Sequence, residues 1–416
     1  MEKFVINGGR KLSGKLRVES AKNSVLPILA ASILTNEEVI IKDCPKILDV
    51  LNMIRILAFL GVKTRFSDGN LIINSSGING YAIPQSLSNQ LRSSIFMMGA
   101  LLSRCGKAEL AYPGGCEIGL RPIDIHLKGL KNLGILVEDT GGEIICVADK
   151  MCGGEVYLDF PSVGATENVM LSAVTAKGKT EIRNAAKEPE IVDLMRFLNA
   201  MGAKVYGAGT STILIEGVEK LHGAVFKPVS DRIEAGTYLI ATAITGGEIE
   251  LENCSAKNIS SLIHKLCDNA CKISIKNDII YLKSGACRKS FSFATGPYPC
   301  FPTDLQAPLM SLATVSDGVS VITENVFEMR YRHVQELVKM GADITVSGRT
   351  AIVKGVKRLM GATVNAHDLR GGASLIIASL NAEGKTIVED INHIQRGYYE
   401  MDKKLRSLGA DIKKKN

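Results

Sequence analysis

The sequence predicts an α/β protein of two domains, each built from three copies of one repeating unit. Six copies of about 69 residues fill the 416-residue chain, and a fixed period is the signature of a repeat architecture. The length exceeds what one ordinary core accommodates and suits two domains of about 200 residues. Strand-like and helix-like segments alternate within each copy, which indicates the α/β class.

The copies are recognised by their endings, where a small residue follows the last turn of a helix. Glycine stops a helix at this position because it readily adopts the left-handed conformation. The six endings are Leu60-Gly61-Val62, Leu133-Gly134-Ile135, Met201-Gly202-Ala203, Asn269-Ala270-Cys271, Met340-Gly341-Ala342 and Leu408-Gly409-Ala410.

The third copy shows the order of elements most clearly: strand, helix, strand, helix, strand, strand. Alternating apolar residues predict the strands, and apolar residues three and four positions apart predict the second helix. Ser162, ahead of an apolar run, is a helix start signal. The expected segments are residues 155–160, 162–175, 180–184, 190–201, 204–206 and 212–215.

The two helices of a copy differ in their polarity. The first is apolar or small on all sides and is expected to be buried, whereas the second is amphipathic and is expected at a surface. We therefore expect three buried helices inside each domain, with sheets and amphipathic helices outside and pseudo-threefold symmetry. The two domains should join near Pro228 and Val229.

Composition excludes several classes of function. The net charge is only +7, aromatic residues make up 5% of the chain, and there is no Trp, so nucleic-acid binding is not expected. No apolar run approaches the roughly 18 residues of a membrane span, and the start lacks an export signal.

Ten cysteines in such a chain predict free thiols in the cytoplasm. Cys267 and Cys271 lack further zinc ligands and are expected to pack as small apolar side chains.

Charged or capping residues stand where each buried helix begins. Free backbone N–H groups and the helix dipole favour anions there, and adjacent lysine or arginine suits a phosphate-bearing substrate. Charged caps are also ordinary features of helices, but four such positions together favour a functional site. These four are Lys22, Arg92, Asp304 and Arg370.

The second copy contains a glycine-rich loop at residues 113–124 in place of a short turn. The loop carries Cys116 five residues before Arg121, and a nearby cation lowers the pKa of a thiol. Cys116 is either a reactive thiol or one of ten unremarkable cysteines, and its loop favours the first interpretation.

His126, just after the loop, is expected to cap or pack rather than catalyse. The chain has no P-loop, no Rossmann motif and no Ser/His/Asp order.

Seven motifs occur in order along the whole chain. They are SAKNSVLPILAA at residues 20–31, PGGCEIGLRPID at 113–124, LDFPSVGATEN at 158–168, FPTDLQA at 301–307, NVFEMRYRHV at 325–334, DLRGGASL at 368–375 and QRGYYE at 395–400. In these motifs the chain resembles the bacterial UDP-N-acetylglucosamine 1-carboxyvinyltransferases, enolpyruvyl transferases of the EPSP synthase-like family. The resemblance implies a two-domain inside-out α/β barrel with three βαβαββ units in each domain. It places residues 21–228 in one domain and residues 1–20 plus 229–416 in the other, with the active site in the cleft between them.

The resemblance also implies the reaction. The enolpyruvyl group of phosphoenolpyruvate would pass to the 3′-hydroxyl of UDP-N-acetylglucosamine, with release of phosphate through a tetrahedral ketal, as the first committed step of peptidoglycan synthesis. No cofactor and no metal are implied. The small-molecule substrates are the only partners implied, without nucleic acid or membrane insertion, and the oligomeric state stays open, a monomer included.

The resemblance assigns roles to individual residues. Asp304 would be the base, and Cys116 would be the loop thiol that donates a proton or forms an adduct with phosphoenolpyruvate or fosfomycin. Asp368 and Arg370 would line the site. Phosphoenolpyruvate would contact Lys22, Asn23, Arg121, Arg370 and Arg396, of which Lys22 and Arg396 would also be catalytic. UDP-N-acetylglucosamine would contact Asn23, Arg92, Arg121, Pro122, Ile123, Asp124, Ile125, Ser162, Val163, Gly164, Asp304 and Val326.

Two positions depart from the family pattern, because Asn89 and Phe160 stand where some members carry lysine. Part of the nucleotide pocket would then depend on other groups. The nearest alternative is a 5-enolpyruvylshikimate-3-phosphate synthase, which has no counterpart of the cysteine loop. A non-catalytic repeat scaffold is the alternative of a different class, and it gives no reason for cations and Asp304 to stand at helix starts.

Overall fold

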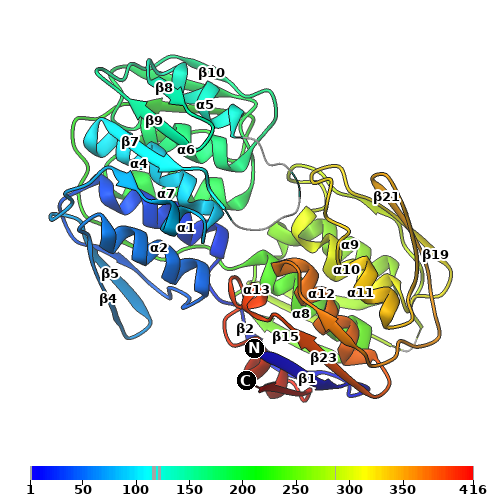
Figure 1. Cartoon of the computed structure of the whole chain (residues 1–416). Helices are drawn as coiled ribbons and strands as arrows, with labels where there is room; N and C mark the ends of the chain where they lie inside the picture. Colours follow the sequence, from blue (N-terminus) through cyan, green and yellow to red (C-terminus); the bar gives the residue numbers. More distant parts are fainter. Residues whose placement is uncertain (1, 115–118, 120–122, 286, 416) are drawn as a thin grey trace. The chain divides into compact units, whose positions relative to one another are not determined.

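The computed structural model describes residues 2–114, 119, 123–285 and 287–415. The chain folds into two compact units, each a mixed α/β structure. The N-terminal unit holds the described residues of 20–229 apart from Gly119. The C-terminal unit holds residues 2–19, Gly119 and residues 230–415. Figure 1 labels the elements of both units.

The N-terminal unit contains three four-stranded sheets. In the order of the strands across each sheet, the first is β14 (Val225–Phe226), β3 (Val39–Ile41), β5 (Asn70–Asn74) and β4 (Lys63–Ser67). The second is β6 (Ala82–Ile83), β7 (Lys107–Ala111), β9 (Glu143–Val147) and β8 (Leu136–Asp139). The third is β10 (Glu155–Tyr157), β11 (Lys179–Arg183), β13 (Thr212–Glu216) and β12 (Lys204–Tyr206).

The C-terminal unit also contains three four-stranded sheets. The first is β2 (Ser13–Arg17), β15 (Glu248–Glu252), β17 (Ile279–Lys283) and β16 (Lys272–Lys276). The second is β18 (Phe293–Ala294), β19 (Val319–Thr323), β21 (Thr350–Lys354) and β20 (Asp343–Ser347). The third is β22 (Thr363–Asn365), β23 (Lys385–Glu389), β1 (Lys3–Asn7) and β24 (Asp411–Lys415).

All six sheets share one pairing pattern. The first two strands of each order are parallel, and the other pairs are antiparallel. In each sheet the second strand follows a helix, as a parallel pair requires a crossover connection. Three sheets recruit strands from distant sequence: β14 completes the sheet of β3, β1 joins the sheet of β23, and β2 joins the sheet of β15.

A group of buried helices lies inside each unit. They are α1 (Lys22–Ala31), α4 (Phe96–Cys105) and α6 (Val163–Ala173) in the N-terminal unit, and α8 (Arg232–Thr245), α10 (Gln306–Ala313) and α12 (Leu369–Asn381) in the C-terminal unit. In the C-terminal unit all three pack on one another, and in the N-terminal unit α4 packs on both α1 and α6. Every residue of α8 and α10 is buried. This confirms the expectation that a helix without a polar face is covered all round.

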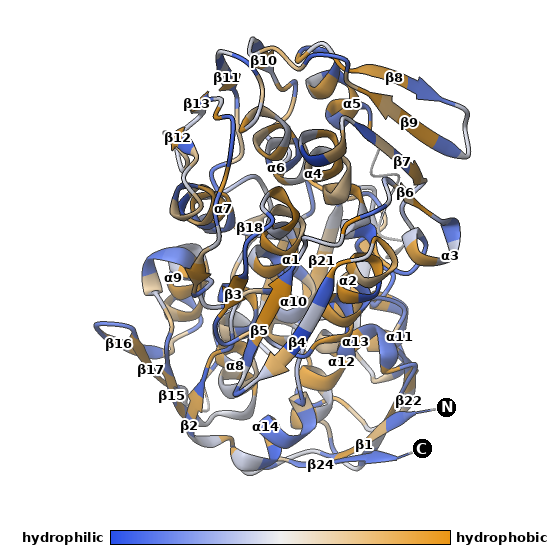
Figure 2. Cartoon of the chain, turned by 90° about the vertical axis from the view of Figure 1, so that its left-hand side faces the viewer, coloured by the Kyte–Doolittle hydropathy of each residue, from blue (hydrophilic) through white to orange (hydrophobic). Residues whose placement is uncertain are grey.

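The second helix of each copy is amphipathic, as predicted. These helices are α2 (Leu48–Phe59), α5 (Asp124–Lys131), α7 (Pro189–Ala200), α9 (Ser260–Asp268), α11 (Val334–Lys339) and α14 (Met401–Ser407). In Figure 2, α12 is largely hydrophobic, whereas α14 is largely hydrophilic. Short helical segments complete the fold: α3 (Gln85–Ser88), α13 (Asn392–Gln395) and the 3₁₀ turns Ser32–Leu34, Arg92–Ile95, Ala256–Ile259 and Thr303–Leu305.

The repeat endings take the left-handed conformation that the sequence predicted. Gly61, Gly202 and Gly409 have φ angles of 90°, 95° and 98°. Ala270 keeps the same conformation without glycine, at a φ of 73°. The side chain of the preceding Asn269 holds this turn, because its Nδ2 donates to Lys289 O at 2.6 Å and to Ser316 Oγ at 3.0 Å.

The nine cysteines that the structure describes are all free thiols. Cys271 is buried and packs in the core, as expected, but the same expectation is wrong for Cys267, whose side chain is exposed. The two residues face different surroundings because α9 ends at Asp268 and the chain turns back into β16. No helix in the described part of the chain has the length and apolar character of a membrane span.

Candidate active site

In the C-terminal unit, aspartates cap two of the three buried helices. Asp231 Oδ1 accepts hydrogen bonds from the backbone N–H groups of Ile233 and Glu234 at 2.8 and 2.9 Å, before α8. Asp368 Oδ1 accepts from Arg370 and Gly371 at 3.0 and 2.9 Å, before α12. A capping carboxylate satisfies the free N–H groups and interacts favourably with the helix dipole. The caps therefore fix where Arg370, the second residue of α12, lies.

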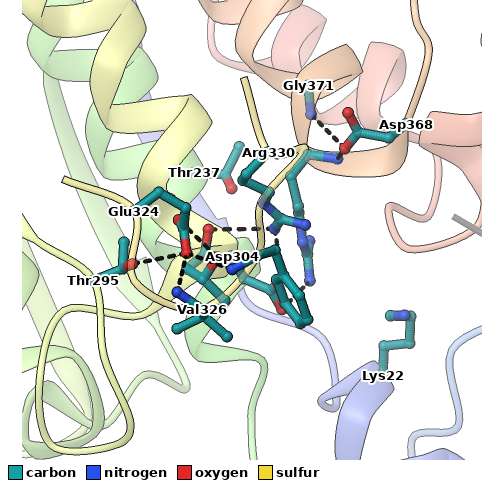
Figure 3. A network of polar contacts seen from close by, with 12 residues as sticks. Lys22, Thr237, Thr295, Asp304, Glu324, Val326, Arg330, Asp368 and Gly371 are labelled. Atoms are coloured by element: carbon teal, nitrogen blue, oxygen red, sulfur yellow. Dashed lines mark hydrogen bonds and ion pairs between the residues drawn. The ribbon is translucent and has the colours of Figure 1, made fainter. Parts of the chain in front are cut away.

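The third helix start carries Asp304, which contacts two guanidinium groups. Asp304 lies in the 3₁₀ turn that leads into α10. Its Oδ1 accepts from Arg330 Nη2 at 2.8 Å, and its Oδ2 accepts from Arg370 Nη2 at 3.3 Å. Both arginine side chains are 3% exposed, whereas the aspartate side chain is 28% exposed. The two arginines thus hold the carboxylate in one orientation (Figure 3), while part of it stays exposed.

Arg370 is a buried cation with unused donors. Its Nε and Nη1 atoms make no hydrogen bond to any residue that the structure describes. The guanidinium carbon lies 5.3 Å from the ring centroid of Tyr398, whose hydroxyl forms a 2.8 Å hydrogen bond with Thr237 Oγ1. Buried polar groups are nearly always hydrogen-bonded, and arginine suits carboxylates and phosphates. The guanidinium therefore holds two enclosed donors without a hydrogen-bond partner among the described residues, next to the Asp304 carboxylate.

His333 lies beside this cluster but carries no charge near neutral pH. Burial lowers the pKa of His333 to about 4 against the opposing effect of Asp368, and the nearby Arg330 cation makes a smaller contribution in the same direction as burial. The ring is within 3.1 Å of the Arg330 backbone oxygen through its Nδ1. His333 therefore helps to shape the arginine segment rather than binding anions as a cation.

In the N-terminal unit, Lys22 is the first residue of α1 and is held by an ion pair. Its Nζ lies 3.1 Å from Oδ2 of Asp49, in the first turn of α2. The side chains are 13% and 1% exposed. A cation at a helix N-terminus opposes the dipole, so Asp49 offsets an unfavourable placement. Asn23, the next residue of α1, is partly buried.

Arg92 occupies the equivalent place before α4. It opens the 3₁₀ turn Arg92–Ile95, and its Nη1 donates to the backbone oxygen of Pro113 at 3.2 Å. Pro113 begins the glycine-rich loop. Arg92 therefore connects a buried helix start with the base of that loop.

The start of α6 is shaped by His126. Ser162 caps the helix, its Oγ accepting from Ala165 N at 3.3 Å. Asn168 Nδ2 donates to His126 Nδ1 at 2.8 Å, so this imidazole is packed, as expected. The ring lies against Gly164, where an added Cβ would come within 2.9 Å of His126 Cε1. Backbone and ring thus approach closely beside Val163.

Several further predicted site residues are located by the helices and strands that they begin or follow. Ile123 is buried just before α5, which begins at Asp124 and continues through Ile125. Val326 follows β19, and Arg396 follows α13, two residues before Tyr398. Cys116, Arg121 and Pro122 lie outside the described residues.

Sequence analysis did not predict three residues that hold candidate site residues or their neighbours in place: Asp49, Glu324 and Arg330. Arg330 and Glu324 stand in or beside the NVFEMRYRHV motif, but neither stands at a helix start. Glu324 is 0% exposed and accepts hydrogen bonds from the segments of both Thr303 and Val326. The sequence feature that could have identified Glu324 is its position directly after a strand, β19 (Val319–Thr323).

Comparison with known proteins gives a consistent result. Residues 6–405 match the family described as EPSP synthase (3-phosphoshikimate 1-carboxyvinyltransferase). The UDP-N-acetylglucosamine 1-carboxyvinyltransferase 2 of Caldanaerobacter subterraneus subsp. tengcongensis is 50% identical over 413 residues, 99% of each chain. The UDP-N-acetylglucosamine 1-carboxyvinyltransferase of Finegoldia magna is 49% identical over 419 residues, covering 100% of this chain and 99% of its own.

Solved structures share the fold. The enolpyruvyl transferase NikO from Streptomyces tendae superposes with a TM-score of 0.89 at 22% identity, covering 99% of this chain and 98% of its own. EPSP synthase from Acinetobacter baumannii gives a TM-score of 0.77 at 19% identity, covering 100% of both chains. The resemblance carried by the sequence motifs is confirmed.

Proposed function

The chain belongs to the EPSP synthase family and, within it, to the UDP-N-acetylglucosamine 1-carboxyvinyltransferases, and we propose that it catalyses their reaction. The enolpyruvyl group of phosphoenolpyruvate is transferred to the 3′-hydroxyl of UDP-N-acetylglucosamine, and phosphate is released. This is the first committed step of peptidoglycan synthesis, and we place it in the bacterial cytoplasm. The observation that carries the proposal is the Asp304 carboxylate between Arg330 and Arg370, with donors of Arg370 unused.

The chemistry is an addition followed by an elimination. The 3′-oxygen forms a bond to the central carbon of phosphoenolpyruvate, the methylene carbon gains a proton, and the hydroxyl loses one. The resulting tetrahedral ketal then loses a proton from the methyl carbon and expels phosphate. The steps need a base, an acid and fixed cations beside the phosphate and carboxylate.

Asp304 is the proposed base, since its carboxylate is oriented and partly accessible. Cys116 is the proposed acid or adduct-forming thiol. Lys22, Asn23, Arg121, Arg370 and Arg396 would bind phosphoenolpyruvate, with Lys22 and Arg396 stabilising charge that develops on the phosphate. The buried placement of Lys22 and Arg370 supports this role, because electrostatic interactions strengthen away from water.

The sugar nucleotide would contact a second set of residues, in which Asp304 and Asn23 hold the sugar. The set is Asn23, Arg92, Arg121, Pro122, Ile123, Asp124, Ile125, Ser162, Val163, Gly164, Asp304 and Val326. Phe160 is 43% exposed and has no charge to offer a phosphate. Asn89 is likewise uncharged, so binding of the nucleotide phosphates would depend on other cations, of which we propose Arg92.

We also propose a finer description of the fold. The six sheets and their helices correspond to six βαβαββ repeats with pseudo-threefold symmetry in each domain. The domains, residues 21–228 and residues 1–20 plus 229–416, are inside-out α/β barrels that contribute to one active site. The common pairing pattern of the six sheets supports this description.

The experiment is phosphate release from phosphoenolpyruvate with and without UDP-N-acetylglucosamine, before and after fosfomycin. We expect release to require the sugar nucleotide and to stop after fosfomycin. Release that ignores the sugar nucleotide contradicts the proposal, and release that requires shikimate 3-phosphate supports the alternative synthase. Cys116→Asp should retain turnover and lose the inhibition. Inhibition that persists in this variant would remove Cys116 as the alkylated thiol.

A further inference from the structure

Glu324, immediately after β19, is a fully buried carboxylate that accepts four hydrogen bonds. Its Oε1 accepts from Thr295 Oγ1 at 2.8 Å and from the backbone N–H groups of Val326 and Phe327 at 2.8 and 3.1 Å. Its Oε2 accepts from Thr303 Oγ1 at 3.0 Å. Figure 3 shows these contacts converging on the one side chain.

The donors to Glu324 come from the two segments that bear candidate site residues. Thr303 precedes Asp304 in the turn that opens α10. Val326 is a candidate sugar contact, and Phe327 leads toward Arg330, whose guanidinium carbon lies 5.8 Å from the Phe327 ring centroid. Glu324 therefore joins the segment of the proposed base to the segment of a sugar contact.

The network closes through Arg330. Arg330 Nη2 donates to Thr303 O at 3.2 Å as well as to Asp304 Oδ1 at 2.8 Å. A shift of Thr303 would displace both oxygens that this guanidinium binds. Because Glu324 holds Thr303 by its hydroxyl, the position of the Asp304 carboxylate depends on Glu324 through Thr303 and Arg330.

A carboxylate is the side chain that suits this place. Its two oxygens are acceptors only, so all four donors can be satisfied at once. An amide would present N–H groups to one side, and an apolar side chain would leave two backbone N–H groups buried without a partner. Among the residues that the structure describes, no cation contacts Glu324. Burying a charge costs free energy, which here the four hydrogen bonds to Glu324 partly offset.

We propose that Glu324 is a positioning residue. It fixes the turn Thr303–Leu305, which carries Asp304, relative to the backbone at Val326 and Phe327, so that both are correctly placed for reaction with the sugar hydroxyl. The inference rests on the proposed function. A misplacement of about 1 Å at a reacting group can lower a rate about 100-fold. The expected effect therefore appears in kcat and in the KM for the sugar nucleotide. The KM for phosphoenolpyruvate should stay unchanged.

The test compares Glu324→Gln and Glu324→Ala with wild type in sugar-dependent phosphate release. We expect kcat to fall about 10-fold for the glutamine variant, which keeps one acceptor oxygen, and about 100-fold for the alanine variant. Thr303→Val should lower kcat about 10-fold, and Thr303→Ser, which keeps the hydroxyl, should recover most of it. This pair decides the question if Glu324→Ala fails to fold.

Two comparisons separate positioning from stability. Glu336 is a matched control, because it is also buried and accepts from a backbone N–H, that of Asn365 at 3.0 Å, but contacts neither turn. Glu336→Gln should lower the midpoint of thermal unfolding and leave kcat within about 2-fold. In an Asp304→Asn background, Glu324→Gln should cause no further loss of kcat, since the group that it positions is gone.

The outcomes distinguish the two proposals. A wild-type enzyme that releases phosphate only with the sugar nucleotide supports the proposed function. If the Glu324 and Thr303 variants then retain wild-type kcat, or lose it additively with Asp304→Asn, the positioning role is wrong while the function stands. A wild type without sugar-dependent release overturns the proposed function itself.

Discussion

The two units share a sheet pattern and buried helices, yet the side chains at their helix starts differ. In the C-terminal unit, Asp231 and Asp368 cap their helices and Asp304 is bound by two arginines. In the N-terminal unit, α1 begins with Lys22 and has no side-chain cap, and a 3₁₀ turn that begins with Arg92 precedes α4.

The same arrangement of buried helices therefore presents different side chains in the two units. In the C-terminal unit the starts of α10 and α12 lie together, because Asp304 contacts Arg370. Under the proposed function, the Asp304 carboxylate would take the proton of the sugar hydroxyl, and Arg370 beside it would bind an anionic group. Lys22 and Arg92 in the N-terminal unit would bind phosphate and carboxylate groups.

The largest expected effect is at the carboxylate of the C-terminal unit. Asp304→Asn should lower kcat about 1,000-fold, within the range for loss of a general base, while UDP-N-acetylglucosamine still binds. Steady-state kinetics and calorimetric titration measure the two quantities. Asp402→Asn is the control, because Asp402 also pairs with an arginine, Arg406 at 3.1 Å, but on α14. Full activity of Asp304→Asn would exclude Asp304 as the base.

The next effect is at the cation of the N-terminal unit. Lys22→Gln should lower kcat/KM for phosphoenolpyruvate about 100-fold, because a buried charge-assisted contact to the ligand is lost. Asp49→Asn should lower it about 10-fold, since the lysine stays but is less well held. Lys128→Gln removes a comparable ion pair, with Asp159, whose two side chains are more than half exposed, and it should change little. An equal effect of Lys22→Gln and Lys128→Gln, which both remove one positive charge, would mean that net charge, not placement, matters.

A third effect compares two buried carboxylates, each bound to a backbone N–H at a point where the chain passes from one unit to the other. In the N-terminal unit, Asp193 Oδ2 accepts from the backbone N–H of Val229 at 2.8 Å and from the hydroxyl of Ser24. In the C-terminal unit, Glu234 Oε2 accepts from the N–H of Glu19 at 2.8 Å. Burial raises the pKa of Asp193 to about 6 and that of Glu234 to about 7, the latter against the opposing effect of Lys404.

For Asp193, the folded state binds a proton more tightly than the unfolded state, whose pKa is near 3.8. Its contribution to the free energy of unfolding is therefore full below pH 4 and is lost as pH rises to about 6. Relative to wild type, Asp193→Asn should gain about 2 to 3 kcal/mol across this window. Urea unfolding at pH 4 to 7 measures the difference. A constant difference across these pH values would contradict the raised pKa.

Much of the fold could be predicted because local chemistry repeats. The left-handed endings and the buried first helices follow from residue size and polarity alone. The roles of β14, β1 and β2 could not be read from the period, because their partners lie far away in sequence. Cys267 was misjudged because spacing places it one turn from Cys271, whereas the end of α9 leaves only Cys271 in the core.

The candidate site was predictable only where function coincides with a helix start. Asp304 and Arg370 fulfil that condition, and the structure brings them together across 66 residues. Three other residues contact the candidate site residues without standing at a buried-helix start. Glu324 follows β19, Arg330 lies between β19 and α11, and Asp49 is in α2. Their partners are set by tertiary packing, which no local pattern encodes.

The smallest effect tests whether close packing at the start of α6 matters for the sugar nucleotide. Gly164→Ala would bring a Cβ within 2.9 Å of His126 Cε1, and overpacking of this kind costs about 1 to 3 kcal/mol. We expect about 10-fold weaker binding of UDP-N-acetylglucosamine in calorimetric titration, because the ring and the helix start must separate. Gly142→Ala is the matched control, since an added Cβ there meets nothing within 4 Å. Unchanged affinity in Gly164→Ala would show that the N-terminal unit tolerates change here, unlike the proposed Asp304 turn of the C-terminal unit.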